Sequence, residues 1–150
     1  RLDRRGGRQG KGCGRMSSFH LQIVTPDGLF YDGEAESLDV RAVTGGVTIL
    51  PGHINYVTPL GMGQARVVTG GKTRRAACIG GMLMVKNGAV RLIATTFEWQ
   101  EQIDRARAQR ALTAAQERLK HRGALTDEEI RLAEAKLRRA LVRTSLTKNA

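Results

Sequence analysis

The sequence is poor in aromatic residues, which make up 4% of its 150 residues. Its core must therefore consist mostly of Val, Ile, Leu, Met and Ala. No apolar run approaches the roughly 20 residues that a membrane-spanning helix needs, and no secretory signal is visible. The two cysteines, Cys13 and Cys78, lack metal-ligand spacing, so we expect free thiols in a reducing compartment. The length suffices for one or two small domains.

Positive charge is in excess, with a formal net charge of +11. Nearly half of it lies in residues 1–15, which hold six basic residues and one acid. Such a charge raises nucleic acid as a partner, although residues 1–15 contain no aromatic side chain that could stack on bases. We expect this basic tail to be disordered or not native, with Met16 as the natural start. A small nucleic-acid-binding protein is the alternative function.

Residues 16–97 contain short apolar stretches that are separated by turn signals. Phe19–Val24 alternates as a strand does, and the following Thr25–Gly28 is a turn in which Pro26 fixes φ and Gly28 accepts a positive φ. Gly70-Gly71 and Asn87-Gly88 predict β-hairpins. The pattern predicts an antiparallel β-sandwich or barrel rather than alternating strands and helices.

Glycines also divide two further apolar segments of this part. Gly61-Met62-Gly63 ends the segment that begins at Tyr56, and Gly80-Gly81 follows Ile79. Gly80-Gly81 is not a phosphate loop, since neither a helix start nor a Gly-Lys-Ser/Thr sequence follows it. We interpret it as a tight turn or bulge.

Residues 98–150 carry helical patterns to the end of the chain. Apolar residues recur at helical spacing in two stripes: Ala108, Ala111, Leu112, Ala115 and Leu119, then Ile130, Ala133, Leu137, Ala140 and Leu141. Gly123 is predicted to end the first helix, and Thr126 with Glu129 forms a capping box for the second. The short connection predicts an antiparallel two-helix hairpin.

The two stripes consist largely of alanine, which buries little area at about 25 cal/mol per Å². We therefore expect the hairpin to be held weakly against its surroundings and to be able to move. The simpler alternative is an appended hairpin that never undocks.

The joint between the two parts is Gln102–Ala108. Asp104 lies where a helix start is predicted, three residues before Arg107, which is typical of an ordinary i,i+3 ion pair. In an antiparallel hairpin that turns at Gly123, Asp104 should face Arg143, and Arg107 should face Arg139. Three guanidinium groups and one carboxylate would then converge, a combination suited to phosphate. The residues alone do not separate a nucleotide site from a solvated salt-bridge network.

Taken in order, these segments resemble the epsilon subunit of F-type ATP synthase, called delta in mitochondria. The resemblance covers residues 16–150 and is carried by Leu21–Gly28, Ile49–His53, Gly80-Gly81 and the joint. Ile103–Ala108 is similar to the family's Ile/Leu-Asp-x-x-Arg-Ala nucleotide motif. The resemblance implies a β-sandwich, residues 16–97, followed by a helical hairpin, residues 98–150.

The resemblance also implies a non-catalytic rotor subunit that couples ion flow to ATP synthesis. Its partners would be the gamma subunit and the membrane ring of c subunits, at the cytoplasmic face of a bacterial membrane, with membrane contact only through the complex. Nucleic acid is not expected as a partner and no cofactor is required. No nucleophile pattern surrounds His53, so we interpret it as a loop histidine that is bonded locally or faces a partner. We assign Pro51, Gly52 and His53 to partner contact.

A regulatory role follows from the same resemblance. The docked hairpin corresponds to active enzyme, whereas helices extended along gamma into the catalytic alpha/beta head inhibit ATP hydrolysis. In bacterial members, ATP binds the docked form as a regulatory ligand. Carried over to this chain, that site would use Glu98, Asp104, Arg107, Arg139 and Arg143.

Four positions depart from the family pattern: Gly46, Thr48, Met84 and Ala114. Relatives often carry Glu, Gly, Glu and Arg at these positions, in the same order. Gly46 and Thr48 put polar contacts with the ring of c subunits in question. Ala114 predicts low ATP affinity or none.

Overall fold

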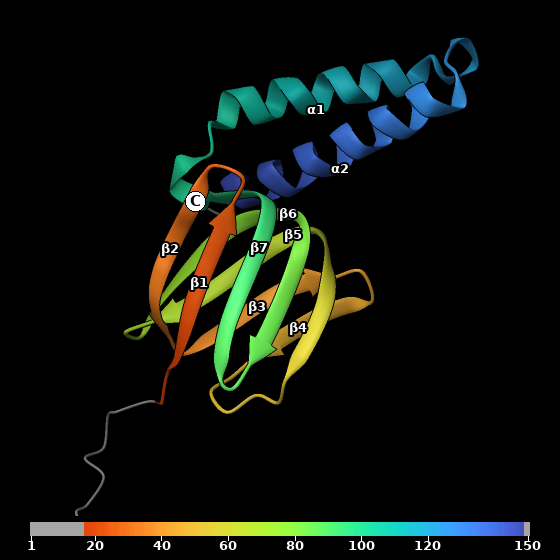
Figure 1. The fold of residues 1–150 in the computed structure, drawn as a ribbon. Coiled ribbons are helices and arrows are strands. Elements are labelled where there is room, and N and C mark those ends of the chain that lie inside the picture. The colour runs from red at the N-terminus through yellow and green to blue at the C-terminus, as the bar shows by residue number, and fades with distance from the viewer. Residues whose placement is uncertain (1–16, 149–150) are drawn as a thin grey trace, which may run out of the picture.

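The computed structural model of the chain describes residues 17–148. The expectations for the basic tail and for Cys13 lie outside these residues. Strands come first in the chain and helices follow, as Figure 1 shows. The elements are β1 (Phe19–Thr25), β2 (Gly28–Ala35), β3 (Ser37–Ala42), β4 (Gly45–Ile49), β5 (Tyr56–Thr69), β6 (Lys72–Lys86), β7 (Ala89–Trp99), the 3-10 turn η1 (Gln100–Gln102), α1 (Arg105–Lys120), the 3-10 turn η2 (Arg122–Ala124) and α2 (Asp127–Lys148).

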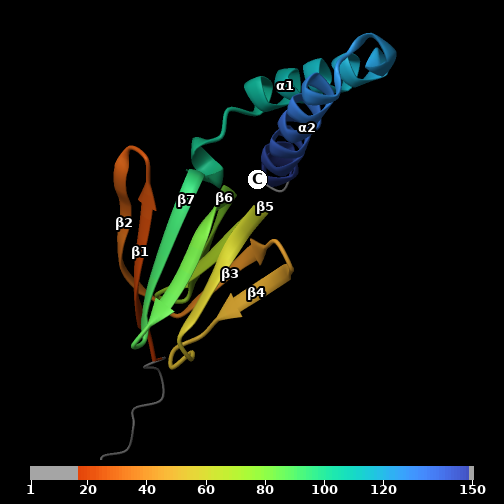
Figure 2. The ribbon, with the colours of Figure 1, turned by 45° about the vertical axis from the view of Figure 1, so that its right-hand side comes forward.

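The described strands form one curled sheet in the order β2-β1-β7-β6-β5-β3-β4. In Figure 2, β1 and β2 lie on one side and β3 and β4 on the other, and the long strands β5, β6 and β7 join them. The β-sandwich and the helical hairpin predicted from the sequence are confirmed. The sandwich is not wholly antiparallel, however, because β7 returns beside β1 in the same direction and pairs with it in parallel.

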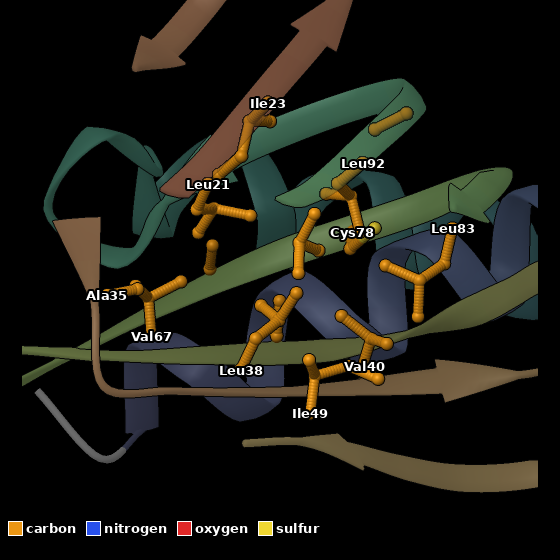
Figure 3. Packing of buried hydrophobic residues seen from close by; sticks show 14 of the residues in the cluster. Leu21, Ile23, Ala35, Leu38, Val40, Ile49, Val67, Cys78, Leu83 and Leu92 are labelled. Atoms are coloured by element: carbon orange, nitrogen blue, oxygen red, sulfur yellow. The ribbon is translucent and has the colours of Figure 1, made fainter. Parts of the chain in front are cut away.

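Aliphatic side chains from both layers fill the core, as the scarcity of aromatic residues predicts. Leu21 and Ile23 from β1 point toward Leu38 and Val40 from β3, and Leu83 of β6 lies nearby (Figure 3). All five are buried. Alternate residues of β1, β3 and β7 are buried, which is the period-2 pattern of a half-buried sheet.

Several turn predictions are confirmed by the strand register. Thr69 pairs with Lys72 across Gly70-Gly71, and Lys86 pairs with Ala89 across Asn87-Gly88. Both central residues of each turn have positive φ, as the tight two-residue hairpin turn requires. The Thr25–Gly28 turn is also present, because Thr25 pairs with Gly28.

The two other glycine interpretations are wrong, because β5 and β6 continue through these residues. β5 passes Gly61 and Gly63 without reversing, and β6 passes Gly80 and Gly81 with the same register on either side. Gly81 has φ +116°, and a side chain there would collide with the backbone of Ile93 on β7. These glycines allow a close approach of two strands rather than a reversal of the chain.

The helical hairpin forms as expected, but its first helix ends early. α1 stops at Lys120 and is followed by η2, which contains Gly123. Gly123 does not adopt the positive φ of a left-handed C-cap, so the assignment of Gly123 as terminator is wrong. The capping box is confirmed, because Thr126 and Glu129 exchange backbone-to-side-chain hydrogen bonds of 3.2 Å in both directions.

The hairpin stands on one end of the sandwich and is attached mainly through the last turns of α2 (Figures 1 and 2). There Ala140, Thr144, Leu146 and Thr147 are buried. α1 packs on α2 and carries a stripe of buried Ala108, Leu112 and Ala115. Within residues 17–148, no helix has the length and apolar character needed to cross a membrane.

Candidate functional site

Asp104 starts α1 and fixes the direction in which the helix leaves the joint. It is the N-cap residue, and its carboxylate accepts a 3.1 Å hydrogen bond from the backbone N–H of Arg107. Within the described residues, no ion pair joins the carboxylate of Asp104 to the guanidinium of Arg107. The helix start is therefore confirmed, whereas the side-chain ion pair is replaced by a cap.

A cavity of about 300 Å³ lies where the start of α1, η1, the end of β7 and the end of α2 meet. Its volume is at the lower end of the range for small-molecule sites. It is lined by Glu98, Gln102, Ile103, Asp104, Arg107, Ala108, Ala111 and Arg143. Four of the five predicted ATP-site residues thus surround one space, and Asp104 and Arg143 meet there as the hairpin register predicts.

Glu98 and Arg143 are directly paired across this cavity. Arg143 donates to one carboxylate oxygen of Glu98 through Nη2 at 2.8 Å and through Nε at 3.2 Å. Both side chains are mostly shielded from solvent, with relative exposures of 27% for Arg143 and 32% for Glu98. The pair links β7 to α2, so it fastens the hairpin to the sandwich.

Arg107 and Arg139 differ in their positions. Arg107 lines the cavity and makes no side-chain hydrogen bond or ion pair with residues 17–148. Arg139 is exposed on α2 and does not line the cavity. The predicted cluster of three guanidinium groups and one carboxylate therefore does not form, because Arg139 is outside the cavity. With Glu98 included, two carboxylates face two guanidinium groups, and Arg107 is the cation left for an anion.

Two further polar contacts hold the end of α2, and both were missed by the sequence reasoning. Gln100 of η1 donates to the carbonyl oxygen of Leu146 at 2.6 Å. Gln64 of β5 donates to the hydroxyl of Ser145 at 2.8 Å. Neither glutamine belongs to a motif, and each partner is more than 40 residues away, so no local signal could have identified them.

The joint itself is fixed to the sandwich by Arg74 of β6. Its guanidinium lies 3.7 Å from the ring centroid of Trp99 and also pairs with Glu101 of η1. The hydrogen bond from Arg74 holds the pKa of the Glu101 carboxyl below its usual value. Trp99 and Glu101, on either side of the start of η1, are therefore both tied to β6.

Pro51, Gly52 and His53 lie in the β4–β5 loop, at the opposite end of the sandwich from the hairpin (Figure 1). His53 Nδ1 lies 2.8 Å from the carbonyl oxygen of Ile54, which is the local bonding that we considered for this histidine. Leu50 and Ile54 flank the turn and are 55% and 77% exposed. The loop thus presents an apolar tip that is remote from the cavity at the joint. Within the described residues, no cluster of three or more His, Cys, Asp or Glu side chains could hold a metal ion.

The architecture defines a class of protein: a β-sandwich followed by a helical hairpin, with a charged cavity at the joint between them. Comparison with family models narrows this class. Residues 18–100 match the beta-sandwich domain of the ATP synthase delta/epsilon chain, and residues 101–148 match its long alpha-helix domain. The chain belongs to the delta/epsilon family of ATP synthase subunits.

Curated relatives agree with this assignment along nearly the whole chain. The ATP synthase epsilon chain of Bacillus velezensis is 42% identical over 134 residues, which are 89% of this chain and 100% of the relative. That of Caldicellulosiruptor saccharolyticus is 38% identical over 128 residues, or 85% and 92% of the two chains. This agreement favours the ATP synthase interpretation over a nucleic-acid-binding module.

Solved structures with the same fold are also found in ATP synthases. A chain of the Euglena gracilis mitochondrial enzyme, in a structure of OSCP, F1 and the c-ring, superposes with a TM-score of 0.71 and 22% identity, covering 87% of this chain and 81% of its own length. A chain from the Tetrahymena thermophila mitochondrial central stalk and c-ring superposes with a TM-score of 0.62 and 10% identity. The match covers 89% of this chain and 98% of that one. Because both sequence identities are low, these two structural matches support the fold alone.

Proposed function

We propose that this chain is a non-catalytic rotor subunit of an F-type ATP synthase and regulates ATP hydrolysis through its helical hairpin. Its partners are the gamma subunit and the c-ring, at the cytoplasmic face of a bacterial membrane. Family membership and the bacterial epsilon chains support this assignment. The related chains from Euglena and Tetrahymena come from assemblies that contain a c-ring.

The observation that carries the regulatory proposal is the narrow attachment of the hairpin. Three polar links tie the last turns of α2 to the sandwich and η1: Arg143 to Glu98, Ser145 to Gln64, and Leu146 to Gln100. Each link contributes about 1 kcal/mol, or somewhat more where a charge takes part. Such an attachment can open without unfolding the sandwich, and the released helices would then reach the catalytic alpha/beta head.

The proposed regulatory ligand is ATP, bound at the cavity of the joint. Arg107 supplies a guanidinium that is free for a phosphate, and Arg143 supplies another if it leaves Glu98. Because the cavity exists only when α2 lies against β7, a bound nucleotide stabilises the docked form. The docked form gains a stabilisation of RT ln(1 + [L]/Kd), about 2.7 kcal/mol when ATP is at a hundredfold excess over Kd. This free energy is comparable with the summed contribution of the three polar links.

Calorimetric titration of the full chain with ATP tests the nucleotide site. Arg107→Ala should abolish or strongly reduce the binding heat, whereas Arg139→Ala should change it little, because Arg139 lies outside the cavity. Equal heats for the native chain and both variants would remove the nucleotide site.

A separate experiment tests the regulatory role. ATP hydrolysis is measured in the assembled enzyme that carries either the native chain or Arg143→Ala, without added regulatory nucleotide beyond the substrate. Loss of the Glu98 link should favour the released hairpin and lower the hydrolysis rate several-fold. An unchanged rate, with the variant shown to be loosened, would reject regulation by the hairpin.

A further inference from the structure

A second cavity lies between the sandwich and α2, and it shares no lining residue with the cavity at the joint. Its volume is about 470 Å³, within the usual range for small-molecule sites. Arg41 of β3 and Val43, which follows that strand, contribute from the sandwich. Arg138 and Leu141 contribute from α2. The cavity is therefore complete only while the hairpin is docked.

The two arginines of this cavity have no carboxylate partner among residues 17–148. Asp39, on the same face of β3 as Arg41, already accepts from Arg66 at 2.7 Å and from Thr48 at 2.6 Å. Glu134, one turn before Arg138 on α2, pairs with Arg122 at 3.1 Å. The nearby acids are thus engaged elsewhere, and both guanidinium groups remain available.

Arg41 is exposed, and its stem lies against β5. Its strand neighbour on β4 is Gly46, which offers no side chain to cover it. On β5, its stem lies over Gly63 so closely that a Cβ at that position would be 2.8 Å from the Cβ of Arg41. The stem of Arg41 thus lies on the sheet, and its guanidinium is accessible to a ligand.

The remaining wall of the cavity is apolar and open to solvent. Val43 is 63% exposed and Leu141 is 47% exposed, and Met62 also lines the cavity. Two free guanidinium groups beside exposed aliphatic side chains complement a molecule with a negative head and a hydrocarbon part.

We propose that this cavity binds an amphiphilic anion, a carboxylate or phosphate head attached to a short hydrocarbon chain. Arg41 and Arg138 hold the head, and Val43, Met62 and Leu141 contact the chain. Because one arginine belongs to the sandwich and the other to α2, the ligand bridges the two parts and stabilises the docked hairpin by linkage. Only this consequence for regulation rests on the proposed function.

The test is calorimetric titration of the full chain with octyl phosphate below its micelle concentration. Inorganic phosphate and octyl glucoside are the comparisons, since each supplies only the charge or only the chain. We expect octyl phosphate to bind at least about tenfold more tightly than either. Arg41→Gln and Arg138→Gln should each weaken binding about tenfold. Arg131→Gln, an exposed arginine of α2 outside the cavity, should leave it unchanged.

Three results would overturn the proposal. The first is that inorganic phosphate binds as tightly as octyl phosphate, and the second is that octyl glucoside does so. The third is that Arg131→Gln weakens octyl phosphate binding as much as Arg41→Gln and Arg138→Gln do. Circular dichroism of each variant checks that the helices are intact. Arg107→Ala, which affects the cavity at the joint, should not change octyl phosphate binding, so failure of the ATP site is distinguishable from failure of this one.

Discussion

At the scale of single residues, the fold depends most visibly on Gly81. This residue has φ +116°, where a side chain is strained, and its backbone lies against Ile93 of the neighbouring strand. Gly46 is different, because its φ is not in the left-handed region and a Cβ there would meet no atom within 4 Å. The two glycines thus form a natural pair for testing which of them is structurally required.

We expect Gly81→Ala to lower the free energy of unfolding by about 3 kcal/mol or more, since strain and overlap with β7 add. Gly46→Ala should change the free energy of unfolding by less than about 1 kcal/mol. The change should be stabilising, because alanine lowers the conformational entropy of the unfolded chain. Urea unfolding of both variants measures the two values. Equal effects would show that β6 and β7 do not approach as closely as described.

Cys78 offers a test of burial at the same scale. Burial raises the pKa of its thiol to about 12, so almost no thiolate exists at pH 8. In a Cys13→Ser variant, which leaves Cys78 as the reporter, a disulfide reagent should react very slowly in buffer and rapidly in concentrated urea. Rapid reaction in buffer would mean that the core around Cys78 opens easily.

At the scale of elements, the sequence predicts those features that have a local cause. The capping box at Thr126 and the hairpin turn at Asn87-Gly88 depend on residues within a few positions of one another, and both are present. The strand β2 was not predicted, because Gly28–Ala35 contains two glycines and two acids and does not alternate clearly. It is a strand because β1 offers it a partner edge, which is a tertiary cause.

The candidate site shows the same division. The joint motif and the hairpin register predicted that Asp104, Arg107 and Arg143 would meet. The outward position of Arg139 could not be predicted, because it depends on the rotation of α2 against the sandwich. Gln64 and Gln100 act through contacts between distant segments, so they left no pattern in the sequence.

The capping box gives a prediction for the second helix. Thr126→Ala should lower the free energy of unfolding by about 1 kcal/mol, because the N–H of Glu129 loses its acceptor. Thr113→Ala is the matched control: its hydroxyl bonds back to the carbonyl oxygen of Gln109 within α1, and alanine is the better helix former there. Thermal unfolding followed by circular dichroism should show loss only for the first variant.

The contact between Arg74 and Glu101 should be visible in the pH dependence of stability. The pKa of Glu101 is lowered in the folded chain from 4.5 by its hydrogen bond with Arg74. A lowered carboxyl pKa stabilises the folded state above about pH 4.5, and this contribution disappears as the pH falls through the folded value.

The difference in unfolding free energy between the native chain and Arg74→Ala should therefore shrink as the pH is lowered from 6 to 3. In a Glu101→Gln background, the same difference should not depend on pH, since no proton is exchanged at that site. Urea unfolding across this range measures both series. A difference that stays constant with pH in the native background would exclude the contact.

At the scale of the whole molecule, the hairpin and the sandwich are unequal in how they are secured. The sandwich closes around a continuous core, whereas α2 is fastened by its last turns and three polar links. Local opening of that attachment should therefore occur at a lower free energy than unfolding of β1, β6 or β7. Hydrogen exchange can rank these elements directly, because each amide reports its own opening.

A ligand confined to the docked form should change this ranking in a defined way. With ATP at a hundredfold excess over Kd, amides of residues 144–147 should become about a hundredfold more protected, the equivalent of about 2.7 kcal/mol. Amides of Leu21 and Leu83 in the core should not change, since their exchange requires global unfolding. In Arg107→Ala the increase should be absent, although unliganded protection stays the same. Protection that rises equally in core and hairpin would mean that ATP stabilises the chain as a whole, and the hairpin could then not serve as the regulated part.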